Sequence, residues 1–273
     1  MNKSEKIGVQ GKTDVPPRLF DLVPRFIEKY GYKDCLFAGK VDRQWVKYNG
    51  QKFYEMTNSI SHGLLKLGVK KGDRIALIAT NAPEWNMIDF AIQQVGAICI
   101  PIYPTISHAD YEYIFNHSEA SIVFVTNKHL YNKVSDIIAS TPSIKDVYLI
   151  RASEGIKSLQ ELIDLGNENR DDAALEAAKA EVKNEDLATI IYTSGTMGTP
   201  KGVMLTHYNI ANNGFLTGEH MKFTSEDKLC VCVPLFHCFG VVLATMNCLT
   251  HGCTQVMVER FDPLVVLASV HKE

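Results

Sequence analysis

Short apolar runs alternate with stretches of helical periodicity from about residue 72 onward. An apolar run of four to seven residues is typical of a buried strand, whereas apolar residues three and four apart indicate one face of a helix. The predicted strands are RIALIAT, AICIPI, SIVFV and DVYLI, with helices predicted over NAPEWNMIDFAIQQVG, 108–117 and 128–139. This alternation predicts an α/β fold with mainly parallel sheets flanked by helices on both faces.

The helix predicted over NAPEWNMIDFAIQQVG has a recognisable start and a recognisable apolar face. Asn81 is expected to cap its N-terminus, with Glu84 three residues later. Trp85, Ile88 and Ile92 fall on one face at helical spacing, so this face is expected to cover the sheet.

A more polar stretch spans roughly residues 152–186, and its alanines and charges predict an exposed helix within a solvated connector. It leads into LATIIY, a continuously apolar run that predicts a buried strand, and then into the loop YTSGTMGTPKG at a sheet edge. GVMLT is predicted as the next strand. A helix is expected to open at Thr206 to Asn209 with a hydroxyl cap, and His207 at its start is interpreted as structural.

Two segments resemble each other and indicate a repeated strand-helix-strand unit. Asp73 to Gly96 and Asp227 to Gly252 each run from an acidic residue through an apolar strand and a helical stretch to a glycine and a second strand. After the second unit, Asp262 and Pro263 predict the start of a last helix. No strand and no C-terminal glycine follow this helix, so we expect a sequence that stops partway through a domain and exposes apolar surface. Residues 1–17 are predicted to be a loose tail, and 18–273 part of one large domain.

Composition and charge narrow the possible partners. The chain is 46% hydrophobic and 22% charged, which is ordinary for a globular protein, and its net charge of -3 comes with scattered lysines. This distribution of charge provides no positive electrostatic potential to attract a nucleic-acid backbone, so no nucleic acid is expected as a partner. No apolar run is long enough to span a bilayer, although peripheral membrane contact stays open.

Seven cysteines without a secretory signal favour a reducing compartment, and a cytoplasmic location is predicted. No CxxC pair occurs, which argues against a zinc site.

The loop YTSGTMGTPKG combines the features of an anion-binding loop. Its three glycines allow several backbone N–H groups to converge on one anion, and its hydroxyl side chains add donors. Lys201 supplies a positive charge, which suits a di- or triphosphate. The sequence matches neither GxxxxGK[ST] nor GxGxxG, and spacing alone leaves an ordinary flexible hairpin as an alternative.

This loop resembles the phosphate-loop signature of the adenylate-forming superfamily, which includes acyl-CoA synthetases, luciferases and peptide-synthetase adenylation domains. The segments KGDRIALIATNAPEW, GAICIPIYPT, KGVMLTHYN and PLFHCFG follow in the family's usual order. VPLFHCFGVVLATMNCLTHG is most similar to medium- and long-chain fatty acyl-CoA synthetases. The resemblance implies a fatty acid:CoA ligase in which a carboxylate attacks the α-phosphate of ATP, pyrophosphate leaves, and coenzyme A cleaves the acyl-adenylate.

The resemblance also implies roles for individual residues. The residues expected to hold the phosphates of ATP are Thr193, Ser194, Gly195, Thr196, Met197, Gly198, Thr199, Pro200 and Lys201. Lys201 is expected nearest the pyrophosphate as the catalytic cation, and Thr193 is expected to approach Mg²⁺. Phe236, His237 and Phe239 are expected to line the pocket for the carboxylic acid.

Two departures from the family pattern are visible. Met197 stands where the family usually has a threonine or serine, which removes one hydroxyl donor. The family's later motifs for adenine, ribose and the catalytic lysine of the small C-terminal domain are not found, so this chain by itself is expected not to complete the reaction. An aryl- or amino-acid-adenylating enzyme of the same superfamily and a non-catalytic ATP or acyl binding module remain alternatives.

Overall fold

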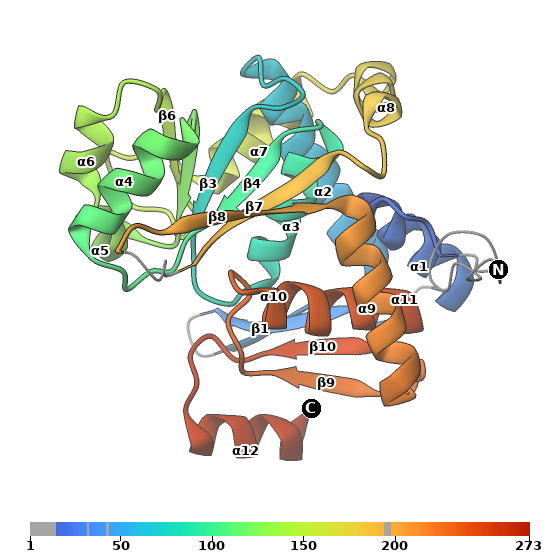
Figure 1. The fold of residues 1–273 in the computed structure, drawn as a ribbon. Coiled ribbons are helices and arrows are strands. Elements are labelled where there is room, and N and C mark those ends of the chain that lie inside the picture. The colour runs from blue at the N-terminus through green and yellow to red at the C-terminus, as the bar shows by residue number, and fades with distance from the viewer. Residues whose placement is uncertain (1–14, 32, 42–43, 194–197) are drawn as a thin grey trace, which may run out of the picture.

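A computed structural model of the chain describes residues 15–31, 33–41, 44–193 and 198–273, and its described strands form two sheets (Figure 1). The strands are β1 (Phe37–Val41), β2 (Gln44–Tyr48), β3 (Arg74–Ile78), β4 (Ile98–Pro101), β5 (Ile122–Val125), β6 (Asp146–Leu149), β7 (Leu187–Thr193), β8 (Lys201–Thr206), β9 (Lys228–Val231) and β10 (Thr254–Met257). The helices of the first half are α1 (Leu22–Tyr30), α2 (Gly50–Lys66), α3 (Pro83–Gln94), α4 (His108–Ser118), α5 (Lys128–Tyr131) and α6 (Ser135–Ser140). Those of the second half are α7 (Leu159–Glu168), α8 (Asp172–Glu181), α9 (His207–Met221), α10 (Cys238–Gly240), α11 (Asn247–His251) and α12 (Pro263–Lys272). A short 3-10 turn, Leu19–Asp21, precedes α1, and a π-helical stretch, Val241–Met246, joins α10 to α11.

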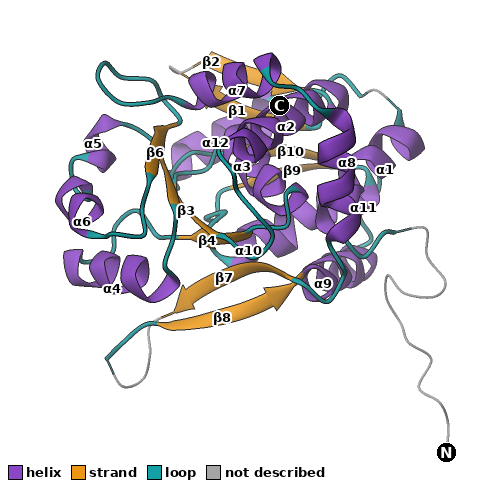
Figure 2. Ribbon diagram, turned by 90° about the horizontal axis from the view of Figure 1, so that it is seen from above, coloured by secondary structure: helices purple, strands orange, loops and turns teal. Residues whose placement is uncertain are grey.

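The large sheet has the strand order β6-β5-β3-β4-β7-β8 and confirms the predicted α/β class. Its strand pairs are parallel except β7–β8, which form an antiparallel hairpin at one edge (Figure 2). Side chains alternate between the two faces along each strand, and each face is buried in a hydrophobic core of its own. In β3, Ile75 and Leu77 join the core shared with α2 and α3, whereas Ala76 and Ile78 join the core under α4.

The small sheet has the order β2-β1-β10-β9 and draws its strands from both ends of the described chain. β1 pairs in parallel with β10, at Phe37 opposite Gln255, and β10 pairs in parallel with β9. α11 lies on the face toward the large sheet and α12 on the opposite face (Figure 1). On α12, Leu264, Leu267 and Val270 are each at least two-thirds exposed, so the apolar surface that the sequence predicts is present.

Helix α3 differs from its prediction in two respects. All twelve of its residues are buried, because it packs against β1 of one sheet and against β3 and β4 of the other. The prediction of a single apolar face with Trp85 and Ile88 therefore underestimated how much of α3 is buried. The predicted cap is also wrong: Ala82 occupies the N-cap position, and the Asn81 side chain bonds elsewhere.

Two other predicted segments also need correction. The helix expected over 128–139 is broken into α5 and α6, because Lys133 and Val134 donate backbone bonds to residues three positions back and form a turn there. Within the polar stretch, α8 is largely exposed as predicted, but α7 is not a solvated connector. Its Leu159, Leu162 and Ile163 are buried, and α7 packs along α2.

The repeated unit is confirmed by its geometry. β3–α3–β4 and β9–α11–β10 are each a parallel strand-helix-strand unit. Gly96 and Gly252 end the two helical stretches with φ of 73° and 84°, a region that favours glycine. The carbonyls of Asp73 and Asp227 accept equivalent backbone bonds, from Ile98 and Thr254.

The termini of the helices follow their sequence signals. Thr206 and Asn209 form a capping box at the start of α9, and the Asp262 side chain caps α12 ahead of Pro263. Of the predicted N-terminal tail, the structure describes residues 15–17, in which Val15 is buried against the core. Among the helices that the structure describes, none has the length and apolar character needed to cross a bilayer.

Candidate functional site

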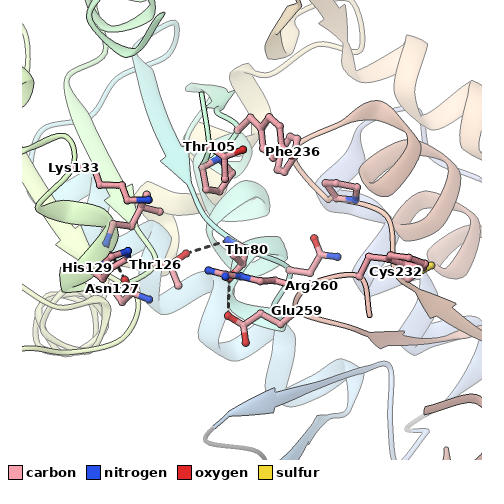
Figure 3. Close-up of a pocket in the computed structure, with 16 residues that line it drawn as sticks. Thr80, Thr105, Thr126, Asn127, His129, Lys133, Cys232, Phe236, Glu259 and Arg260 are labelled. Carbon is pink, nitrogen blue, oxygen red and sulfur yellow. Dashed lines mark hydrogen bonds between the residues drawn. The ribbon is translucent and has the colours of Figure 1, made fainter. Parts of the chain in front are cut away.

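The segments that follow the parallel strands of both sheets meet around a cavity of about 430 Å³ (Figure 3). Parallel strands present their carboxyl ends at one edge, which is where open α/β sheets commonly bind ligands. Among the lining residues, Thr80, Thr105 and Asn127 follow β3, β4 and β5 of the large sheet. Phe236 and Arg260 follow β9 and β10 of the small sheet, and Lys133 lies between α5 and α6.

The cavity wall carries polar and cationic groups. Lys133, His129 and Asn127 lie together on one side, and Phe236 and Cys232 lie on another (Figure 3). Glu259 and Arg260 come from the segment after β10, and Thr80 Oγ1 donates to Glu259 Oε1 at 3.2 Å. The Thr80 N–H donates to Thr126 Oγ1 at 3.0 Å, which joins the ends of β3 and β5.

The three residues expected to line an acid pocket occupy two different environments. Phe236 lines the cavity and stacks on Tyr103, with ring centroids 4.5 Å apart and an interplanar angle of 26°. His237 and Phe239 are exposed and do not line this cavity. His237 is the N-cap of α10, where its Nδ1 accepts the Phe239 N–H at 3.1 Å. Their roles in substrate binding therefore stay predictions.

The two ends of the phosphate loop are fixed by the β7–β8 hairpin. Thr193 and Lys201 form the last residue pair of the hairpin, and both are exposed. Ser194, Gly195, Thr196 and Met197 lie outside the described residues. Gly198 has φ of 99°, so the turn there favours glycine, and Thr199 and Pro200 lead back into β8.

The neighbouring β7 residue Tyr192 is tied to α4. Its hydroxyl lies 2.7 Å from His117 Nδ1, and its ring lies edge-on to both Tyr113 and His117. Burial, with a smaller effect from the nearby Tyr113, raises the pKa of the Tyr192 hydroxyl. Since β7 runs parallel to β4, the loop leaves the sheet at the same edge as the cavity.

Two buried polar residues, one of them at the cavity, make long-range contacts that sequence reasoning missed. Asn81 is buried at the cavity and bonds to backbone groups beyond β9 and β10. Glu84, 7% exposed, accepts from Arg151 Nη1 at 2.7 Å. A polar residue at a helix start normally indicates a cap or a surface position, so no sequence signal points to either contact.

His207 is structural, as predicted from the sequence. It is 1% exposed and its Nδ1 accepts the Leu19 N–H at 3.3 Å. Burial lowers the pKa of His207 to about 4, which keeps the ring neutral near pH 7.

The sequence profile of the AMP-binding enzyme family matches residues 24–273. The chain belongs to this family. As a family member it is 32% identical over 246 residues to the putative acyl-CoA synthetase YngI of Bacillus subtilis, a match that covers 84% of this chain and 45% of YngI. It is 33% identical over 204 residues to the long-chain-fatty-acid--CoA ligase FadD15 of Mycobacterium bovis, covering 74% of this chain and 34% of FadD15.

The fold of this chain is similar to that of a solved ligase. It resembles the long-chain-fatty-acid-CoA ligase FadD1 of Archaeoglobus fulgidus with a TM-score of 0.80 and 28% identity, covering 98% of this chain and 52% of FadD1. The chain thus spans about half the length of that structure and less than half the length of YngI and FadD15.

Proposed function

We propose that the chain takes part in AMP-forming activation of a fatty acid. The acid and ATP give an acyl-adenylate and pyrophosphate, and the thiol of coenzyme A then displaces AMP to give the thioester. One observation carries the proposal. The hairpin that holds the phosphate loop ends at the same sheet edge as the polar cavity, so a nucleotide on the loop would lie beside a second binding space. The names of the relatives, acyl-CoA synthetase and long-chain-fatty-acid--CoA ligase, support the substrate class.

In this proposal, Lys201 neutralises the charge that develops on pyrophosphate as it leaves. The exposed Lys201 and Thr193 project from the last pair of β7–β8, where both can reach one polyphosphate. Mg²⁺ prefers oxygen ligands, and most of these are supplied by water and by the phosphates of the substrate. One protein hydroxyl is then enough, and the exposed side chain of Thr193 could supply it. The metal would supply charge neutralisation to the phosphates. In the described residues, no three His, Cys, Asp or Glu side chains gather into a metal site of their own.

The proposal extends to Phe236, which would form one wall of the acid-binding space, with His237 near the carboxylate. The polar wall formed by Lys133, His129 and Arg260 would accept an anionic group. We further propose that the 273 residues bind the substrates without completing the reaction, and that they act in the cytoplasm. An aryl- or amino-acid-activating enzyme would differ in the acid that supports pyrophosphate exchange, and a binding module would bind ATP and support none.

Lys201→Ala is expected to raise the Kd for ATP about ten- to a hundredfold, because a charge-assisted hydrogen bond contributes about 1.5 to 3 kcal/mol. Calorimetric titration with ATP and Mg²⁺ measures the change. Lys145→Ala is the control, since Lys145 is exposed beside the amino end of β6, at the opposite edge of the sheet. Equal Kd values for Lys201→Ala and the unaltered chain would contradict the proposed role of the loop.

Met197→Thr is expected to lower the Kd for ATP a few-fold, because it restores the hydroxyl donor that the family usually has at this position, worth about 1 kcal/mol. The same titration measures it. Met197→Val is the matched control, because valine has nearly the shape of threonine and lacks the hydroxyl. A Kd that is the same for the threonine and valine variants would show that this position does not contact the phosphates.

A further inference from the structure

The segment 233–240, which follows β9 and carries Phe236 and His237, is hydrogen-bonded to Asn81 of the other sheet, in addition to the stack of Phe236 on Tyr103. Asn81 Nδ2 donates to the carbonyl of Val233 at 2.9 Å and to that of Val258 at 3.1 Å. Asn81 Oδ1 accepts the N–H of Leu235 at 2.9 Å. Because Asn81 follows β3 of the large sheet, this amide joins the large sheet to the ends of β9 and β10 in the small sheet.

These three bonds use both donors and one acceptor site of the amide at a largely buried position on the cavity wall. Asn81 is 7% exposed, and Leu235 is fully buried. A carboxylate of the same shape could keep the bond from Leu235 but would face the carbonyls of Val233 and Val258 without a proton to donate. The arrangement therefore requires an amide.

The backbone of the segment 233–240 is tightly turned next to the residues that Asn81 contacts. A Cβ on Gly240 would lie 2.1 Å from the Pro234 carbonyl oxygen, so the chain closes on itself there. The carbonyl of His237 accepts the N–H groups of Gly240 and Val241 at 2.9 and 3.2 Å. A displacement of residues 233–235 would consequently be passed on to Phe236 and His237.

We propose that Asn81 is a positioning residue: it fixes the segment 233–240 across the two sheets and thereby sets the affinity of the site for its carboxylic acid. This inference rests on the proposed function for its ligand. The phosphate loop connects β7 and β8, and among the described residues Asn81 has no hydrogen bond to either strand. Its effect is therefore expected on the affinity for the acid and not on that for ATP.

The test compares Asn81→Asp with Asn86→Asp in the 273-residue chain. Asn86 is a matched control because it is also buried and its Nδ2 donates to Gln255 Oε1 of β10 at 3.3 Å, while none of its hydrogen bonds among the described residues goes to the segment 233–240. Hydrogen exchange of peptides covering 233–240 reports the positioning without any ligand. Calorimetric titrations with ATP and with decanoate and palmitate report the effect on each substrate.

Asn81→Asp is expected to speed exchange in 233–240 at least about tenfold beyond any change in β3 and β4, and to raise the Kd for the acid about tenfold with ATP affinity kept within about twofold. Asn86→Asp is expected to leave exchange in 233–240 and the affinity ratio unchanged. If Asn81→Asp does not fold, Asn81→Ser, which keeps one short donor, is measured in the same way.

Two results would overturn the inference: exchange in 233–240 that rises no more than in β3 and β4, or equal losses of acid and ATP affinity. If the unaltered chain binds neither acid, the proposed substrate class fails, and the exchange data alone decide whether Asn81 positions the segment.

Discussion

Asp89→Asn is expected to stabilise the protein by about 4 kcal/mol at pH 8 and by less than half as much at pH 5. Asp89 lies in the middle of α3, 2% exposed, and burial raises its pKa from 3.8 to about 7, although bonds from Cys99 and Gln93 oppose this shift. Removing the acid removes the cost of ionising it inside the core.

The pH dependence follows from the direction of this shift. The pKa of Asp89 is higher in the folded state, so the folded protein is relatively favoured below pH 4, where the acid is protonated in both states. Between pH 4 and 7 the unfolded chain loses its proton first, and stability decreases. Above pH 7 the free-energy cost of the buried, ionised Asp89 stays at its full value. The gain of the variant should therefore grow over this range and then stay constant.

Urea unfolding of the unaltered chain and the variant at matched pH values measures the gain. The comparison at each pH cancels the opposite trend from His207, whose lowered pKa decreases stability as pH falls from 6.5 toward 4. Asp164→Asn on the exposed side of α7 is the control and should change stability little at any pH. A gain from Asp89→Asn that does not vary with pH would show that Asp89 is not a buried acid.

Arg151→Met is expected to lower the free energy of unfolding by about 2 to 3 kcal/mol, because it leaves the Glu84 carboxylate buried without its partner. The two nitrogen-oxygen distances of this pair are 2.7 and 3.5 Å. The expected loss is set below that of a fully buried pair because the Arg151 side chain is 32% exposed and solvent screens part of the interaction.

A double-mutant cycle separates this ion pair from simple loss of packing. Glu84→Gln with Arg151→Met should recover most of the stability, since no charge is then left unpaired. Arg170→Met is the control for an exposed pair, because Arg170 and Asp172 are both 64% exposed, and it should change stability little. If the double variant is as unstable as Arg151→Met, packing rather than charge explains the loss.

Periodicity and turn chemistry predicted the strands from β3 to β10, the fold class, the repeated unit and the caps at Thr206 and Asp262, whereas β1 and β2 were not predicted. These features depend on neighbours in sequence, which is why a local pattern reveals them. The β8 strand after the phosphate loop was also predicted, although its antiparallel pairing with β7 was not, because pairing depends on where the hairpin returns.

The failures concern residues whose partners are distant in sequence. Asn81 has the sequence context of a helix cap, yet its partners lie more than 150 positions away. Helix α3 has one obvious apolar face, but packing between two sheets buries its polar residues as well, including Asn86 and Asp89. For the site, the sequence predicted the loop and Phe236, whereas the cavity wall around Lys133 and Arg260 comes from segments without a motif.

The pairing of β1 with β10 has a consequence for the order in which the protein can assemble. The large sheet uses strands between residues 74 and 206, so its contacts can form while the chain is still being synthesised. β1 must wait until β10 has left the ribosome, and until then one edge of the β1–β2 hairpin has no partner. Because the cavity is bounded by both sheets, the ligand-binding region is expected to form only after β10 has been synthesised.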